Sequence, residues 1–224
     1  MDLTPGLLTV SFADDPSNIS RIEYVDTNTR RTLCQVISAD GTVINRFETV
    51  CERVFNQQYG TPVSPDGERL YIGVWTRGLF CYSVSTGKVL WRIGPGRVRH
   101  ILVHGDFVIF CSAGRGIYKV EGKTGTLVKR IPFSGLDVLS SMSPNELFVG
   151  TKRDWYIIYS LPELEENARI RAAWLHALCG GAYILLSAKR CGDELVLEGW
   201  RASQERSGQG SEQFNCSIPL ALLA

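Results

Sequence analysis

The strongest constraint on the fold is a repeat of 38 residues across residues 69–131. Two successive segments there, RLYIGVWTRGLFCYSVSTGKVLWRIG and DFVIFCSAGRGIYKVEGKTGTLVKRI, follow one design. Each has an apolar strand, a turn with Arg-Gly, a second strand, a Thr-Gly turn and a third strand. Leu70 and Val108 open the two copies, and Gly87 and Gly125 close their last turns. A fixed period of this size indicates a stacked or radial repeat.

Extending the pattern in both directions gives five units of four short strands, with hairpin-turn residues between the strands. The second strands are expected to open near Ile22, Leu70, Val108, Leu147 and Ile184. We therefore predict an all-β fold, a five-bladed β-propeller of four-stranded antiparallel blades in a single domain, 1–224. The blades are expected near residues 7–48, 59–92, 100–131, 138–170 and 175–220. The alternative is a β-sandwich, which has no reason to repeat its turns and strand order in phase.

Composition and cysteine usage are those of a globular protein in a reducing compartment. The 224 residues are 44% hydrophobic and 21% charged, with a net charge of +1. No basic leader precedes the first apolar run, and no run reaches the roughly 18 apolar residues that a membrane helix needs. Seven cysteines, an odd number without a C-x-x-C pair, indicate free thiols. These features predict a cytoplasmic protein that does not bind membranes.

Two segments carry a resemblance to known propellers. YSVSTGKVLWRI and YKVEGKTGTLVKRI resemble the blades of quinoprotein-like propellers, which have a Thr-Gly turn and a following Trp. SPDGERLYIG resembles the start of a WD-repeat blade. The resemblance implies blades and no particular reaction, and no cofactor is expected.

Residues suited to catalysis are scarce. The chain has three histidines, and neither a Gly-x-Ser-x-Gly elbow nor a Walker loop occurs. His100 and His176 are expected near the beginnings of inner strands, where a pair could bind a metal or exchange protons. No carboxylate partner recurs at the same blade position, which favours a structural role. We predict that the chain is not an enzyme and holds no metal.

The positions of the charged residues say more about function than the histidines do. In a propeller, second-to-third turns and blade-to-blade links share one face, which here collects Arg, whereas the hairpins of the opposite face collect Asp and Glu. Arginine presents bidentate donors to carboxylates and phosphates, and Trp with Arg is typical of binding hot spots. The predicted partner-binding residues are Arg30, Arg31, Trp75, Arg77, Arg97, Arg99, Arg115, Arg153, Trp155 and Arg190.

These features predict a non-enzymatic propeller that binds one protein partner with an acidic or phosphate-binding-like surface. The most concrete version is an intracellular inhibitor or immunity protein that neutralises a toxin through the Arg-rich face. A nucleic-acid-binding propeller is one alternative, although the pI of about 7.6 is low for that class. A propeller that binds a small ligand or sugar is another, although the aromatic residues do not keep a repeating register.

Overall fold

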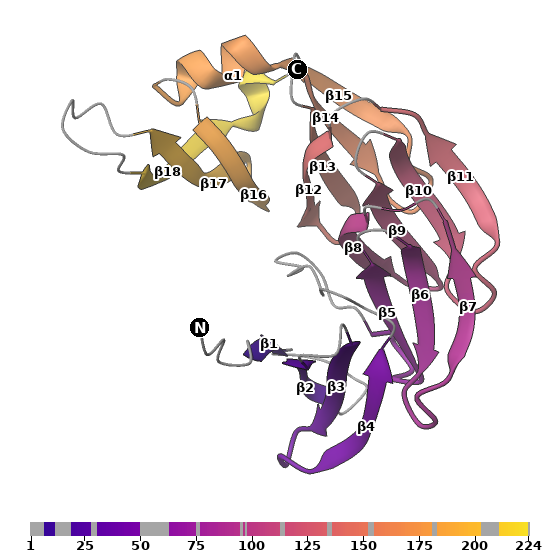
Figure 1. Ribbon diagram of the computed structural model, residues 1–224. Helices are drawn as coiled ribbons and strands as arrows, with labels where there is room; N and C mark the ends of the chain where they lie inside the picture. The colour runs from indigo at the N-terminus through magenta and orange to yellow at the C-terminus, as the bar shows by residue number, and fades with distance from the viewer. Residues whose placement is uncertain are drawn as a thin grey trace. The chain divides into compact units, whose positions relative to one another are not determined.

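The computed structural model forms two compact units, unit 1 (Met1–Pro132) and unit 2 (Phe133–Ala224). It describes residues 7–11, 19–27, 31–49, 63–74, 77–94, 96, 98–112, 115–133, 136–151, 155–180, 183–202 and 211–223. Antiparallel sheets of consecutive strands make up both units (Figure 1). No helix in these ranges is both long and apolar enough to cross a membrane.

The described residues of unit 1 form three sheets, which we number as blades one to three. Their strands are β1 (Leu7–Ser11), β2 (Ile19–Thr27), β3 (Arg31–Ser38) and β4 (Val43–Thr49); β5 (Arg69–Val74), β6 (Gly78–Ser83) and β7 (Val89–Ile93); and β8 (Val98–His104), β9 (Phe107–Ser112), β10 (Gly116–Glu121) and β11 (Leu127–Ile131). In the described part of blade two, the first strand is reduced to a bridge between Val63 and Leu70.

Unit 2 contains blades four and five. Blade four has β12 (Leu136–Ser143), β13 (Glu146–Thr151), β14 (Trp155–Ser160) and β15 (Glu166–Arg171). Helix α1 (Ala172–Leu178) leads to blade five, whose strands are β16 (Tyr183–Cys191), β17 (Glu194–Ala202) and β18 (Ser211–Pro219). A short 3₁₀ helix, η1 (Leu220–Leu222), follows.

The middle strands of blade two are buried on both sides because blades one and three cover its two faces. Leu70 and Ile72 of β5 pack in a cluster with residues of blade one, whereas Tyr71, between them, packs with residues of blade three. Alternate side chains therefore enter two different cores, which explains the unbroken apolar runs in these strands. The fourth strands alternate between exposed and half-buried residues, as expected for the edge of a blade.

An aromatic side chain and a glycine turn join successive blades in unit 1. A Cβ atom on Gly125 would lie 2.7 Å from the Trp91 ring, and one on Gly87 would lie 2.6 Å from Phe47. Both glycines have positive φ. Trp91 Nε1 also donates a hydrogen bond of 3.0 Å to the Gly122 carbonyl oxygen of the next blade. Trp91 is thus an inter-blade residue.

The register of blade five differs from the prediction. β16 is its first strand, because Glu194 pairs with Pro219 as Glu146 pairs with Ser160 in blade four. The Leu220 N–H also donates to the Asp193 carbonyl, as the Leu161 N–H donates to that of Asn145. The predicted second strand near Ile184 is therefore part of the first strand. The segment 214–220, at the end of the range predicted for blade five, is mainly the third strand.

Helix α1 was also not predicted. It carries His176, which was expected at the start of an inner strand. Leu175 on the same helix is fully buried in the core of unit 2, whereas Trp174 and Leu178 are exposed. The helix lengthens the connection between blades four and five, which displaced the predicted register.

Candidate functional site

Two arginines lie in equivalent second-to-third turns of unit 1, as predicted. Arg77 precedes β6 and Arg115 precedes β10, and both are exposed. The Arg77 N–H donates to the Val74 carbonyl at 3.2 Å, and the Arg115 N–H donates to that of Ser112 at 3.0 Å. A glycine with positive φ follows each arginine, and a Cβ there would lie within 2.2 Å of a fourth-strand carbonyl oxygen. The positive φ and this crowding explain why a glycine follows the arginine in both copies.

A second pair of arginines, which the sequence analysis missed, comes from the fourth strands. Arg92 of β7 lies opposite Phe80, and Arg130 of β11 lies opposite Tyr118. The guanidinium carbons are 5.3 and 5.5 Å from the ring centroids, within cation–π range. The signal was present in the sequence, since VLWRI and LVKRI carry Arg at the same place, but only the strand pairing reveals the aromatic partner.

The turn and strand arginines are connected. Arg92 Nε donates to the Arg77 carbonyl oxygen at 3.0 Å. In the next blade, Arg130 Nη2 donates to the Arg115 carbonyl oxygen at 3.3 Å. Each of blades two and three thus presents two guanidinium groups at the same end of its outer strands. We call Arg77, Arg92, Arg115 and Arg130 the basic rim.

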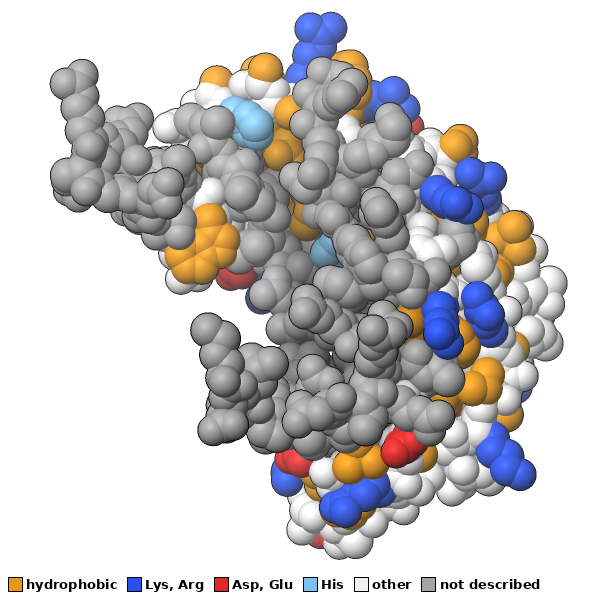
Figure 2. Space-filling model, viewed as in Figure 1, with side chains coloured by type: hydrophobic (Ala, Val, Ile, Leu, Met, Phe, Trp, Pro, Cys, Tyr) orange, Lys and Arg blue, Asp and Glu red, His pale blue; other side chains and the backbone are white. Residues whose placement is uncertain are grey.

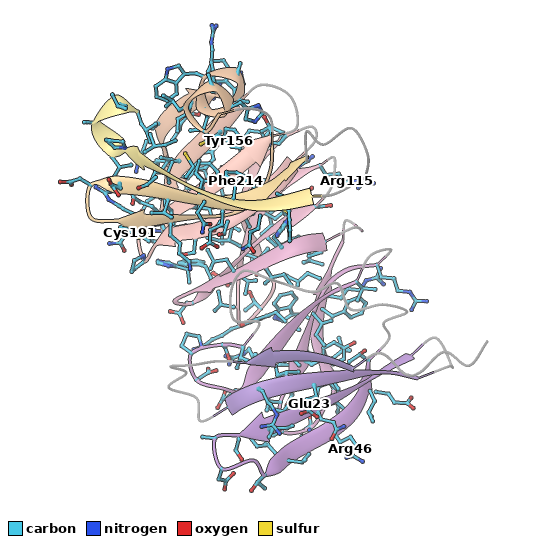
Figure 3. All side chains as sticks on the ribbon, turned by 90° about the vertical axis from the view of Figure 1, so that its left-hand side faces the viewer. Glu23, Arg46, Arg115, Tyr156, Cys191 and Phe214 are labelled. Atoms are coloured by element: carbon cyan, nitrogen blue, oxygen red, sulfur yellow. The ribbon has the colours of Figure 1, made fainter. Side chains whose placement is uncertain are left out.

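The basic rim keeps its charge available. Within the described ranges, none of its four guanidinium groups has a carboxylate oxygen within 4.0 Å. Figure 2 shows Lys and Arg side chains gathered in pairs on the part of unit 1 where Figure 1 places β6, β7, β10 and β11. Arg115 extends outward from its turn (Figure 3). Such a surface attracts carboxylates or phosphates without first breaking internal ion pairs.

Equivalent arginines in other blades are partnered differently. Arg46 of blade one, labelled in Figure 3, donates to Gln35 Oε1 at 2.9 Å. In unit 2, Arg169 forms an ion pair with Glu166 at 2.7 Å and lies over Trp155. Trp155 also has the Arg171 guanidinium 5.5 Å from its ring centroid. The predicted Trp155 is therefore half-buried among arginines at the beginning of β14.

Six other predicted residues are not described at the level of their side chains. Arg30, Trp75, Arg97 and Arg153 lie outside the described residues. Arg31 begins β3 and Arg99 lies in β8, and the side chains of both lie outside the description. Their part in binding stays a prediction.

Arg190 occupies a different turn from the one predicted. It lies near the end of β16, beside the first-to-second hairpin of blade five. Arg190 Nη1 is 2.9 Å from Glu146 Oε1, which begins the second strand of blade four. The sequence pattern places the Lys-Arg pair at 189–190 in a second-to-third turn only if the segment of β16 is the second strand, whereas it is the first. Arg190 instead connects the acidic hairpin ends of the two blades of unit 2.

The first-to-second hairpin of blade two is acidic and internally hydrogen-bonded. Burial opposes ionisation of Asp66, but hydrogen bonds from Ser64, the Glu68 N–H and Arg69, and the charge of Arg69, outweigh it and lower the pKa of Asp66 to about 2. Arg69 Nη1 lies 2.7 Å from Asp66 Oδ2. This carboxylate is therefore ionised at neutral pH and stabilises the hairpin.

In the described residues, the histidines belong to no cluster of three or more possible metal ligands. No cluster of three His, Cys, Asp or Glu side chains capable of holding a metal occurs in those ranges. His176 Nε2 lies 3.3 Å from the Tyr156 hydroxyl, and burial lowers the pKa of the imidazole. His100 lies in β8, the first strand of blade three, whereas His176 lies on helix α1 and not at the beginning of an inner strand.

Comparison with solved structures identifies the fold. BamB from Moraxella catarrhalis matches with a TM-score of 0.60 and 10% identity over 99% of this chain and 62% of that chain. The Cps50 (Swd1) β-propeller domain of Myceliophteria thermophila matches with a TM-score of 0.60 and 11% identity over 90% and 67%. The WD40 β-propeller domain of Doa1 matches with a TM-score of 0.59 and 16% identity over 88% and 63%. No protein-family model and no curated protein sequence matches the chain.

These matches show a β-propeller fold. Together with the five antiparallel sheets, they confirm the predicted fold class. Three of the sheets have four strands, and blades two and five have three in their described parts. The chain spans 62% of the length of the BamB structure, and the likeness extends to the fold alone.

Proposed function

We propose that this chain is a non-enzymatic propeller that binds a protein with an acidic surface through the basic rim. One observation carries the proposal: two successive blades present four exposed guanidinium groups for which the described residues supply no carboxylate. The propeller fold supports it, because this fold suggests a protein-interaction scaffold.

The basic rim is also preorganised. In each blade, the strand arginine is held by an aromatic ring below it and by the carbonyl oxygen of the turn arginine. A guanidinium that is already positioned loses less side-chain entropy when it binds a carboxylate. The aromatic and aliphatic surface beneath it adds apolar contact, which suits a protein partner more than a free anion.

In its most concrete form, the partner is a toxin that this chain neutralises in the cytoplasm. A toxin with an acidic recognition surface would be attracted to the basic rim at a rate that depends on salt. On this proposal, the inhibitor expected from the sequence binds its toxin through the basic rim. An assay of the partner's own activity with and without this chain distinguishes an inhibitor from a scaffold that leaves the activity unchanged.

The test is affinity capture from a lysate of the source organism after nuclease treatment, with a charge-reversal variant. Arg77→Glu/Arg115→Glu changes the net charge from +1 to −3, because each substitution removes a positive charge and adds a negative one. We expect one stoichiometric protein to bind the wild-type chain and to be lost with the variant. Binding of the purified partner should weaken at least roughly tenfold for the variant.

A matched control uses the same two blades. Lys88 and Lys123 are exposed in the third-to-fourth turns at the other end of these hairpins. Lys88→Glu/Lys123→Glu therefore produces the same net charge away from the basic rim and should retain the partner. Equal loss with both variants would reduce the effect to net charge. Retention by both, or capture of nuclease-sensitive nucleic acid only, would refute the proposal.

A further inference from the structure

Unit 2 places two cysteines in contact that are far apart in the chain. Cys179 follows helix α1, and Cys216 lies in the third strand of blade five. Their Sγ atoms are 2.6 Å apart, and both residues are present as thiols. Many cysteine pairs cannot form a disulfide unless the backbone moves to bring their sulfur atoms together. Because these two sulfur atoms are already in contact, the backbone does not need to move to bring them together.

We propose that Cys179 and Cys216 are a site of thiol–disulfide exchange, which a low-molecular-weight disulfide oxidises to an intramolecular bond between α1 and β18. The proposal is independent of the function assigned to the basic rim, since both cysteines belong to unit 2.

The surroundings fix both partners. The Cys179 N–H donates to the Leu175 carbonyl oxygen at 3.1 Å, and Leu175 is fully buried. Cys216 lies between Phe214 and Ile218 on the inward side of β18, in the same hydrophobic cluster as Cys179. Figure 3 shows Phe214 within unit 2. Because neither element can move without disturbing this core, the thiols stay together in the folded chain.

The difference in exposure sets the order of the reaction. Cys216 is partly exposed, whereas Cys179 is buried. The Cys216 thiolate attacks one sulfur of the small disulfide, forming a mixed disulfide and releasing one small thiolate. The Cys179 thiolate then attacks the Cys216 sulfur, forming the intramolecular bond and releasing the second small thiolate. The two cysteines lose two protons and two electrons, and the small disulfide gains both.

The other described cysteines are poorly placed to compete. Cys34 and Cys81 are fully buried in unit 1, and burial raises the pKa of each thiol to about 12. Thiolates are the attacking species, so these two thiols react slowly in the folded chain. Cys191 is exposed at the end of β16, and Figure 3 shows it away from Phe214. Among the described thiols, Cys191 is the one that is exposed to a small disulfide and has no second sulfur atom in contact with it.

The test oxidises folded, reduced protein with glutathione disulfide in a Cys191→Ser background. After acid quenching, intact mass should show the loss of two hydrogen atoms without a glutathione adduct, and digestion should give one cross-linked pair of peptides containing Cys179 and Cys216. The same digestion of the wild-type chain gives this link without any substitution. Oxidation should also raise the Tm of the protein by roughly 10 °C, because the bond closes a loop that contains β16 and β17.

A matched variant isolates the pair. Cys216→Ser in the same background keeps the size of the side chain and should abolish the mass loss, the cross-linked peptides and the shift in Tm. A stable glutathione adduct on Cys216 in the Cys191→Ser protein would refute the proposal, because Cys179 would then have failed to displace it. An unchanged mass, or a link between other cysteines, would refute it as well.

Discussion

Gly125→Ala tests whether the joint between blades two and three depends on the Trp91 ring. Gly125 has φ +73°, and an alanine there takes a left-handed conformation that costs about 1–2 kcal/mol. The added Cβ would lie 2.7 Å from Trp91 Cδ2 and 2.8 Å from Cε3. The ring is held by its hydrogen bond to Gly122, so this contact adds about 1–3 kcal/mol of overpacking. We expect a total loss of about 2–5 kcal/mol in the free energy of unfolding.

Gly41→Ala is the matched control. Gly41 lies in the third-to-fourth turn of blade one with φ +87°, but a Cβ there meets nothing within 4 Å. Its cost should therefore be the backbone term alone, about 1–2 kcal/mol. The difference between the two variants measures the packing of Trp91 against the turn.

The assay is equilibrium unfolding in urea, followed by far-UV circular dichroism and tryptophan fluorescence. Trp91→Leu, combined with Gly125→Ala, completes a double-mutant cycle. With the indole removed, Gly125→Ala should cost no more than Gly41→Ala. Equal costs for the two single alanine variants, within about 0.5 kcal/mol, would refute the joint as described. So would a difference that survives Trp91→Leu.

Two further predictions concern charge. The folded-state pKa of Asp66 is lowered from 3.8 to about 2, so its stabilising contribution is present above pH 4 and is lost as the pH falls from 4 to 2. Because Asp66 is largely exposed, Asp66→Asn should lower the free energy of unfolding by less than about 1 kcal/mol at pH 7. The variant should also lose less stability between pH 4 and 2 than the wild-type chain does, as measured by urea unfolding at each pH. An unchanged dependence of stability on pH would contradict the pKa shift. Arg190→Ala removes the ion pair with Glu146 and should change the free energy of unfolding by less than about 1 kcal/mol at low salt, and by less at 1 M salt. A loss above about 2 kcal/mol would mean that Arg190 does more than form a surface ion pair.

The fold was predictable because the repeating positions are occupied by residues that favour one particular backbone conformation. Gly87 and Gly125 mark positive φ in equivalent turns, and the apolar runs between them are strands buried on both sides. Turn glycines and apolar strands depend on local backbone conformation and on the spacing of apolar residues, and both can be inferred from a sequence. The placement of Arg77 and Arg115 followed directly from that register.

Blade five was misassigned because its sequence fits two registers. The segment AKRCGD ends with hairpin chemistry and also carries the Lys-Arg pair that resembles a second-to-third turn. The structural equivalent of Leu147 is Leu195, 48 residues later, whereas the prediction used Ile184 at 37. Helix α1, which has no side-chain N-cap and only seven residues, supplied no signal strong enough to reveal the longer connection.

The strand arginines were missed for a different reason. Arg92 and Arg130 recur in the sequence, but their value to a binding site depends on Phe80 and Tyr118 lying directly opposite and on the turn carbonyls beside them. Cross-strand partners follow from register, and a bulge shifts the register between β6 and β7 and between β10 and β11. Periodicity alone does not locate such a bulge.

The aromatic–glycine joint has a consequence for how such a protein changes length during evolution. Blade two carries both parts: Gly87 receives Phe47 of the preceding blade, and Trp91 packs on Gly125 of the next. A tandem copy of this one segment would place its own glycine against the original Trp91 and its own tryptophan against Gly125. Both new junctions would form without a compensating substitution in either neighbour. Gene duplication of a single 38-residue segment could therefore add a blade in one step.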